Sequence, residues 1–593
     1  MEIQAVVSGN RIKRKLRRSH TGCQQCRQSK VKCDEGQPQC GRCVRLRHHC
    51  DYNLRPRKKY TRKPKPPTLA DAISSQHSSP ATSGASQHSA RSIKDTRTTT
   101  TTTTTIPDSG SGDAAVGWTA PESQVLDLSS VSPEAASVLD PIDHAALHYY
   151  RFVLPVSVDG KDPRYGGPAL IWALAEKNVM VMHSVCALAG RKMCEKLEPP
   201  LEEAHARRCL AVEHCTEALR MLNMALEGHG RTQDLNCILG ALWMMLNYEQ
   251  NFGDGSGHGF RAHLRGAAAM YNGRIGNVAN ILPPIRPTVS VETQIQTDIA
   301  AVPSPLTCQL MVWIGLVDGA AAINGLGGAF CRLLGGSQHD DGRIVPSAQL
   351  DIFRALQKRA DMAPFELWGS SYPQDEMVDD LQNSQLMCLQ TEVGQLRYLL
   401  SYLTEDPFPD IAAGSSSTMN PRLAFEKDIL HVIRDLETRH GGIFQLAGSL
   451  DTRKMASPSQ KRFAISARHV CAFFHACVLC FKRIVRGSQS PDSEQRNALR
   501  EITTLASLAH QDNGEDGMVQ FGWTLFVAAL ESDDFIHRTW LLERIELLAR
   551  RGENFRRAHN TLRLAMSEQG PGDRRLAYTC LVRRHDIERF VLT

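Results

Sequence analysis

The sequence of 593 residues is poor in several features that define whole classes of protein. Its first ten residues contain no apolar run long enough for the core of a secretion signal, so we expect no signal peptide. Aromatic residues make up only 6% of the chain, and alternating strand patterns are scarce. Because no secretion signal is expected, we place the 18 cysteines in a reducing compartment, where metal binding or core packing is favoured over disulfides.

No segment is predicted to span a membrane. The most apolar stretch, Gln309 to Cys331, contains five glycines and has Asp318 near its middle. Inserting a central Asp into a bilayer costs about 2.5–3.5 kcal/mol. The stretch therefore predicts a buried helix followed by a loop, and we expect no membrane partner.

Acidic residues are scarce at one end of the chain. Residues 1–65 contain 19 Lys or Arg and four acidic residues, a net charge of +15, whereas the remaining 528 residues carry −9. A basic head on a mildly acidic body predicts a polyanion partner for the head alone. The runs Arg11–Arg18 and Arg55–Lys65 also match short nuclear import signals, so we expect a nuclear location.

The composition divides the chain into five segments. Between residues 68 and 133 Ser, Thr, Ala and Gly dominate, which cannot bury enough apolar surface to offset the entropy of ordering. From about residue 140, apolar residues recur at helical spacing. The predicted organisation is a basic arm (1–19), a cysteine-dense module (20–52), a basic linker (53–67), a disordered Ser/Thr-rich linker (68–139) and one large all-α domain (140–593).

Helices are predicted throughout that last segment, and no helical repeat of fixed period is evident. The predicted helices cover residues 168–197, 201–226, 235–250, 260–271, 306–322, 386–403, 424–438, 461–485, 521–529, 535–551 and 554–566.

Six cysteines near the N-terminus follow the pattern C-x2-C-x6-C-x6-C-x2-C-x6-C. They are Cys23, Cys26, Cys33, Cys40, Cys43 and Cys50. Two intervening residues let both thiolates turn onto one ion at the start of a helix, as in tetrahedral zinc sites. Six thiolates either fill one site with two left over or hold two Zn²⁺ ions if two of them bridge. The repeat of one C-x2-C-x6-C unit favours two ions, with Cys23 and Cys40 as the bridges.

Metal binding is the predicted source of folding energy for this module, because few apolar residues lie between positions 20 and 52. A three-disulfide knot is the main alternative, but it explains neither the reducing context nor the interleaved Lys and Arg. A redox C-x-x-C pair lacks the surrounding strand–helix pattern.

The module resembles the fungal binuclear zinc cluster transcription factors. The resemblance is carried by C-R-Q-S-K-V-K-C-D at Cys26–Asp34 and by Pro38, two residues before Cys40. It implies two short helices, the first of which enters the major groove of double-stranded DNA, usually at a CGG-type triplet. The second half-repeat would pack against the first.

The resemblance also implies which residues contact DNA. Lys30 occupies the position that reads guanine, whose O6 and N7 accept hydrogen bonds. Arg27 and Lys32 occupy phosphate-contacting positions, which orient the protein without reading sequence. Ser29 departs from the family pattern, since many members have Lys or Arg there. The flanking basic residues Arg55, Arg57, Lys58 and Lys59 are further predicted DNA contacts.

The helical body is similar to the regulatory domain of one class of these factors. The similarity rests on G-F-R-A-H-L-R-G-A-A at 259–268 and F-G-W-T-L-F-V-A-A at 521–529. Gly266 with the alanines after it predicts a close approach of two helices. Glycine-rich segments 253–259 and 325–328 follow no predicted strand, so a nucleotide site is not expected. Cys471, Cys477 and Cys480 are predicted to be buried thiols.

Two function classes remain open at this point. The first is a non-enzymatic, sequence-specific DNA-binding regulator of genes transcribed by RNA polymerase II. Its expected protein partners are co-regulators, and its expected target is a metabolic gene cluster, such as one for a secondary metabolite. The second is a zinc-dependent scaffold or effector-sensing protein whose helical domain carries the main function. No apolar heptad occurs between Lys65 and Pro133, so the chain either binds DNA as a monomer or forms a homodimer through the helical domain.

Overall fold

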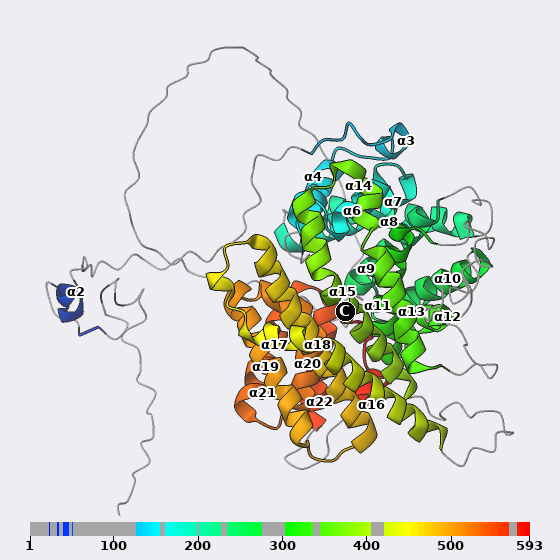
Figure 1. Ribbon diagram of the computed structural model, residues 1–593. Helices are drawn as coiled ribbons and strands as arrows, with labels where there is room; N and C mark the ends of the chain where they lie inside the picture. The colour runs from blue at the N-terminus through cyan, green and yellow to red at the C-terminus, as the bar shows by residue number, and fades with distance from the viewer. Residues whose placement is uncertain are drawn as a thin grey trace, which may run out of the picture. The chain divides into compact units, whose positions relative to one another are not determined.

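Figure 1 shows the computed structural model of the protein. The chain divides into two units, Met1–Ser111 and Gly112–Thr593, which are described separately. In the first unit the structure describes residues 23, 26, 33, 34, 39–46 and 50. In the second unit it describes residues 126–154, 161–197, 201–226, 234–274, 303–335, 344–404, 420–568 and 578–593.

All regular secondary structure in the described part of the second unit is helical, as predicted. The first group of elements comprises α3 (Pro133–Ala136), α4 (Asp143–His148), the π-helix η1 (Tyr149–Val153), α6 (Gly167–Ala175), α7 (Val179–Leu197), α8 (Leu201–Leu226), α9 (Leu235–Phe252) and α10 (His258–Arg274). The middle group comprises α11 (Pro305–Ile323), α12 (Ala329–Gly335), α13 (Pro346–Ala360), α14 (Ala363–Trp368), α15 (Gln374–Tyr402) and α16 (Pro421–Arg439). The last group comprises α17 (Gly441–Ser449), α18 (Pro458–Arg486), α19 (Ser493–Asn513), α20 (Gly522–Glu531), α21 (Phe535–Leu548), α22 (Glu553–Glu568) and α23 (Tyr578–Val582).

Several helices begin where the sequence supplies a cap. The Ser304 hydroxyl accepts the N–H of Thr307 at 3.2 Å, and Pro305 occupies the first turn of α11, where its missing N–H is not needed. Asp492 and Gln495 form a reciprocal capping box at the start of α19. Such caps typically contribute about 1 kcal/mol each.

Helices α11 and α15 lie at the centre of one continuous hydrophobic core. Figure 1 shows them between the blue-to-green first group and the yellow-to-orange last group. They approach closely because glycines face each other. A Cβ at Gly319 would lie 3.1 Å from the Gly394 carbonyl oxygen, and a Cβ at Gly394 would overlap Leu316. The prediction of a close approach at Gly266 was wrong, since a Cβ there would meet only Leu226, at 4.0 Å.

The predicted buried helix within 309–331 is confirmed as α11, which ends at Ile323. Helices α11 and α18 are long and apolar enough to cross a membrane by length and composition, but 83% and 61% of their apolar windows are buried inside the fold. Asp318 is fully buried and accepts the N–H groups of Gly328 (2.7 Å) and Cys331 (2.8 Å) at the start of α12. Burial raises the pKa of Asp318 to about 6, although these hydrogen bonds oppose the shift.

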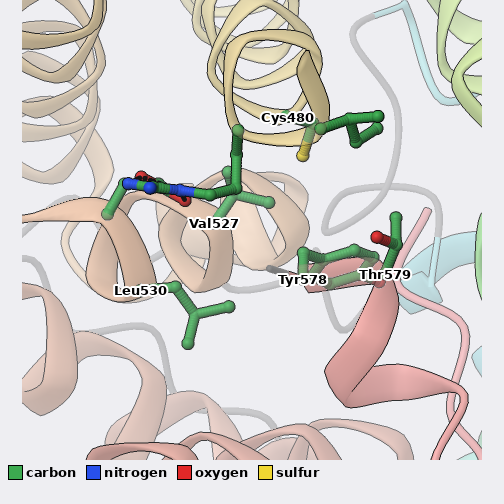
Figure 2. Close-up of a pocket in the computed structure, with 8 residues that line it drawn as sticks. Cys480, Val527, Leu530, Tyr578 and Thr579 are labelled. Carbon is green, nitrogen blue, oxygen red and sulfur yellow. Dashed lines mark hydrogen bonds and ion pairs between the residues drawn. The ribbon is translucent and has the colours of Figure 1, made fainter. Parts of the chain in front are cut away.

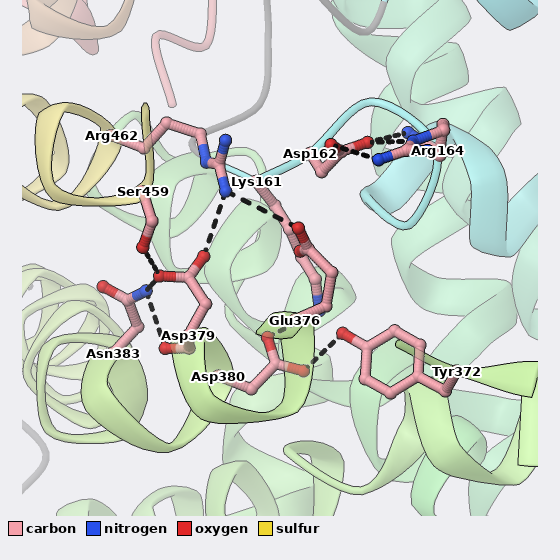
Figure 3. A network of polar contacts seen from close by, with 10 residues as sticks. All are labelled: Lys161, Asp162, Arg164, Tyr372, Glu376, Asp379, Asp380, Asn383, Ser459 and Arg462. Atoms are coloured by element: carbon pink, nitrogen blue, oxygen red, sulfur yellow. Dashed lines mark hydrogen bonds and ion pairs between the residues drawn. The ribbon is translucent and has the colours of Figure 1, made fainter. Parts of the chain in front are cut away.

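A polar network fixes the N-terminal end of α15 (Figure 3). Arg462 on α18 lies 3.2 Å from an Asp379 oxygen, and Asp380 accepts hydrogen bonds from Lys161 and the Tyr372 hydroxyl, both at 2.6 Å. These bonds connect α15 to α18 and to the loop before α6. The network therefore holds a half-helix that contributes few side chains to the apolar core.

The C-terminal segment packs into the core as an extended chain. Val591 exchanges two hydrogen bonds with the Asn554 side chain (3.0 and 2.7 Å), and Arg397 donates to the carbonyl of Leu592 at 2.7 Å. Val591 and Leu592 are only 3% and 2% exposed. The end of the sequence is thus part of the folded body.

The structure differs from the predicted elements in several places. The segment predicted as one helix over 168–197 is two, α6 and α7, separated by a turn. Helix α15 begins at Gln374, twelve residues before the predicted start, and α12, α13, α17 and α19 were not predicted. The predicted disorder up to residue 139 extended too far, because Val131 and Ala135 are buried against the body.

Candidate metal centre and nucleic-acid interface

The cysteine-dense module brings its thiol groups together. Cys23, Cys26, Cys40 and Cys43 have Sγ atoms within 4.8 Å of one another, and Cys33 lies within the same distance of Cys40. The Cys50 Sγ accepts the N–H of Cys40 at 3.3 Å. All six predicted ligand residues thus lie in one cluster, and the structure joins none of the six in a disulfide.

The sulfur separations match a shared-edge pair of zinc tetrahedra. Cys23 and Cys40 are 3.7 Å apart, Cys23 and Cys43 are 3.7 Å apart, and Cys26 and Cys40 are 3.7 Å apart. Zn–S bonds of about 2.3 Å place two sulfurs of one tetrahedron about 3.8 Å apart, whereas a disulfide needs about 2.05 Å. Each of these contacts involves Cys23 or Cys40, the two residues predicted to bridge. The residues present therefore fit two zinc ions.

Each half of the repeat starts in the same way. The Cys40 Sγ accepts the N–H of Cys43 at 3.4 Å and so caps α2 (Gly41–Arg45). In the first half, the Cys23 Sγ accepts the N–H of Cys26 at 3.5 Å. The first cysteine of each C-x2-C pair thus accepts the N–H of the second, which turns the second thiol toward the same point.

The module has no apolar core besides its cysteines among the described residues. Cys23, Cys26, Cys40 and Cys43 are fully buried, whereas Val44 and Leu46 are 56% and 45% exposed. In these described residues apolar burial is confined to the cysteines, so bound metal is the predicted source of the module's stability.

Electrostatics also favour a cation here. The N–H of Cys43 lowers the pKa of the Cys40 thiol. Burial raises the pKa of Cys26 to about 12 and raises that of Cys43 further, with neighbouring sulfurs adding to both shifts. Thiolates packed this closely repel one another unless positive charge lies between them. Zinc ions supply that charge.

The predicted DNA contacts Arg27, Lys30 and Lys32 lie outside the described residues. The same holds for Arg55, Arg57, Lys58 and Lys59. Within the described part, α2 carries Arg42 and Arg45, which the sequence analysis did not single out. Their positions within and just after the second C-x2-C pair were the available signal, because Arg27 directly follows the first C-x2-C pair in the sequence.

One small cavity in the helical body is lined by residues of α18, α20 and α23. This cavity has a volume of about 10 Å³, which holds about one water. Figure 2 shows Cys480, Val527 and Tyr578 around it. The predicted burial of the thiols Cys471, Cys477 and Cys480 is confirmed, and burial raises their pKa values well above the ordinary range, so they are poor nucleophiles.

A basic, cysteine-folded module attached to a large helical body defines a class of zinc-dependent DNA-binding regulators. Comparison with protein families makes this specific. Residues 21–60 match the fungal Zn(2)-Cys(6) binuclear cluster domain, and residues 134–565 match the fungal specific transcription factor domain. The second match spans most of the chain, and the protein belongs to this family of fungal transcription factors.

A relative matches over the module alone. The lysine biosynthesis regulatory protein LYS14 of Saccharomyces cerevisiae (strain ATCC 204508 / S288c) is 44% identical over 54 residues. The match covers 9% of this chain and only 7% of the yeast protein. No solved structure matches the chain. The chain thus combines a fungal zinc cluster domain with a fungal transcription factor domain.

Proposed function

We propose that this protein is a nuclear, sequence-specific regulator of genes transcribed by RNA polymerase II. The observation that carries the proposal is the set of six clustered cysteines, with sulfurs 3.7 Å apart, inside a segment of charge +15. Two Zn²⁺ ions bound by the six thiolates, with Cys23 and Cys40 bridging, would hold the module as a rigid wedge. The proposed organisation is the module at 20–52 between basic segments at 1–19 and 53–67, followed by a linker and the regulatory body.

The proposed recognition element is the first half-repeat, which reads a CGG-type triplet. Lys30 donates to guanine, and Arg27 and Lys32 position the module on phosphates. If about six phosphates are neutralised, the logarithm of the binding constant falls with the logarithm of salt concentration at a slope of about −5. The basic residues Arg55, Arg57, Lys58 and Lys59 contribute further phosphate contacts.

The test is a binding titration of the full chain with duplexes that contain CGG or a scrambled triplet. We expect Lys30→Ala to reduce the preference for CGG by about 1–3 kcal/mol, while Arg57→Ala weakens binding to both duplexes and makes the salt slope less steep by about 1. The matched control is Lys427→Ala, an exposed residue of α16 in the acidic body. Unchanged triplet preference in Lys30→Ala would contradict the assigned readout.

The pathway proposed for this regulator is metabolic, such as a biosynthetic or secondary-metabolite gene cluster. The support is the similarity of the module to a protein named for lysine biosynthesis. Mapping of bound sites across the genome tests the proposal directly. Co-regulators are the expected protein partners, and a homodimer formed through the helical body is the proposed assembly, because no heptad follows the module.

Effector sensing by the helical body is the second candidate function. A pocket of about 310 Å³ is lined by Trp172, Trp368 and Phe152, together with Arg151 and Glu176. Arg151 and Phe152 lie on the π-helix η1, an element that often marks functional sites. Arg151 and Glu176 place one positive and one negative charge on the wall of this pocket, so it suits a small zwitterion. Thermal shifts with a panel of amino acids, lost in Arg151→Ala, would support it.

A further inference from the structure

A second group of metal-ligating side chains lies in the helical body, far along the sequence from the cysteine module. Helices α4, α7 and α8 pack together at one end of the body (Figure 1). They contribute Asp143, Cys186 and His214, whose ligand atoms all lie within 4.8 Å of one another. These side chains belong to residues that are only 3%, 1% and 4% exposed. Three ligand types from three helices thus converge in a buried site.

The hydrogen bonds of His214 orient its ring. Its Nδ1 lies 2.7 Å from the Nδ1 of His183, and its Nε2 lies 3.0 Å from the Asp143 Oδ2. In metal sites the ligating histidine bonds to the ion through one nitrogen and to an outer partner through the other. His183, one turn before Cys186 on α7, occupies the position of that outer partner, which leaves Nε2 facing the carboxylate and the thiol.

The set also has the right composition for a transition metal. One imidazole, one thiolate and one carboxylate are the ligand types that Zn²⁺ takes in proteins, whereas Ca²⁺ and Mg²⁺ take oxygen ligands. The carboxylate is already held, since the Asp143 Oδ2 accepts the N–H of Asp140 at 2.9 Å. Three protein ligands leave one position for water or a further ligand, as in open zinc sites.

We propose that Asp143, Cys186 and His214 bind one divalent transition-metal ion of the zinc class, with His183 as the positioning residue. This ion would fasten α4 to the α7–α8 pair inside the regulatory body. The site is separate from the cysteine module and does not depend on the function proposed for that module.

The test is the zinc content of the purified full chain, measured by native mass spectrometry at buffered free zinc. We expect Cys186→Ala to lose one ion relative to the unmodified protein. Cys215→Ala is the matched control, because Cys215 is a buried thiol next to His214 that is not part of the group. His183→Asn should still bind at saturating zinc but about 10–100-fold more weakly.

Cobalt(II) provides a second readout. After loading with Co²⁺, the unmodified protein should absorb more than Cys186→Ala by an amount typical of one cobalt–thiolate bond. The spectrum of Cys215→Ala should equal that of the unmodified protein. Equal metal content in the unmodified protein and Cys186→Ala would overturn the proposal and leave the group as a buried Asp–His–His hydrogen-bond chain. If Cys186→Ala does not fold, Asp143→Asn serves in its place.

Serine replacement of the six cysteines of the module separates the two proposals. That variant should lose the ions of the module but retain the ion at Asp143, Cys186 and His214. Retention of module zinc in that variant would contradict the proposed function alone, whereas loss of every ion would contradict the site in the body.

Discussion

The two units of this protein are stabilised in opposite ways. In the described residues of the first unit, the buried side chains are those of cysteines, and nearby apolar residues such as Val44 are exposed. In the second unit one continuous core is built from helices and contains fully buried phenylalanines such as Phe474 and Phe526. A short segment that must present many basic residues cannot also supply a hydrophobic core, and metal ions replace that core.

Zinc removal should produce the largest effect, and its main consequence should be the loss of the first unit's fold. Structural zinc contributes about 10–16 kcal/mol to the folding of small zinc modules. We expect a strong chelator to abolish duplex binding of the full chain while the main calorimetric unfolding transition stays cooperative. Re-addition of Zn²⁺ should restore binding. Loss of the main transition together with DNA binding would show that the two units are not independently stabilised.

A large-to-small substitution in the core tests the opposite unit. Phe526 is fully buried and contacts Tyr578 edge-to-face, with ring centroids 5.5 Å apart. We expect Phe526→Ala to lower the free energy of unfolding of the body by about 3–5 kcal/mol without changing zinc content. The control is Phe535→Ala, since Phe535 is 81% exposed. Urea unfolding measures both variants, and equal effects would contradict the assigned core.

The buried carboxyl of Asp318 should make the stability of the body depend on pH. Burial raises its pKa to about 6 from an ordinary value of 3.8. The folded protein therefore holds this proton over a range where the unfolded chain releases it, and stability falls as pH rises from about 4 to 6. The contribution is about 3 kcal/mol, because each pKa unit corresponds to about 1.4 kcal/mol.

Asp318→Asn should remove that contribution to the pH dependence, as judged from urea midpoints at pH 4.5 and 7. The exposed Asp428→Asn on α16 should retain it. A wild-type slope in Asp318→Asn would mean that Asp318 is ionised throughout this range.

Two glycine-to-alanine substitutions test how closely the helices of the body approach one another, and their expected effects are the smallest. Gly266→Ala places a methyl group in ordinary contact with Leu226, without a clash, and should stabilise the body by about 0.5–1 kcal/mol. Gly319→Ala pushes α11 against the backbone of α15 and should destabilise it by about 1–3 kcal/mol. Thermal unfolding distinguishes the two, and shifts of the same sign would contradict the close approach at Gly319.

The sequence predicted the helical body best where apolar residues recur on one face. Helix α8 was predicted with its observed bounds, Leu201–Leu226. The first half of α15 was missed because polar bonds to Lys161 and Arg462, distant in sequence, hold it in place of apolar packing. The turn between α6 and α7 contains neither proline nor glycine, so the two helices were merged.

The metal site of the cysteine module could be predicted because its ligands lie close together in the sequence. Cysteine spacing placed Cys23 and Cys40 as equivalent members of a repeat, and the structure brings their sulfurs together. The group of Asp143, Cys186 and His214 has no such signal, because 43 and 28 residues separate its members and only the packing of α4, α7 and α8 unites them. Contacts that depend on tertiary packing leave no spacing pattern in a single sequence.

The most direct test of the metal-folded module is the difference in zinc content between the full chain and the variant with all six module cysteines replaced by serine. We predict a difference of two ions, accompanied by complete loss of binding to a CGG-containing duplex. A difference of zero or one ion, or a zinc-free module that still binds this duplex specifically, would contradict a pair of zinc ions as the source of its fold.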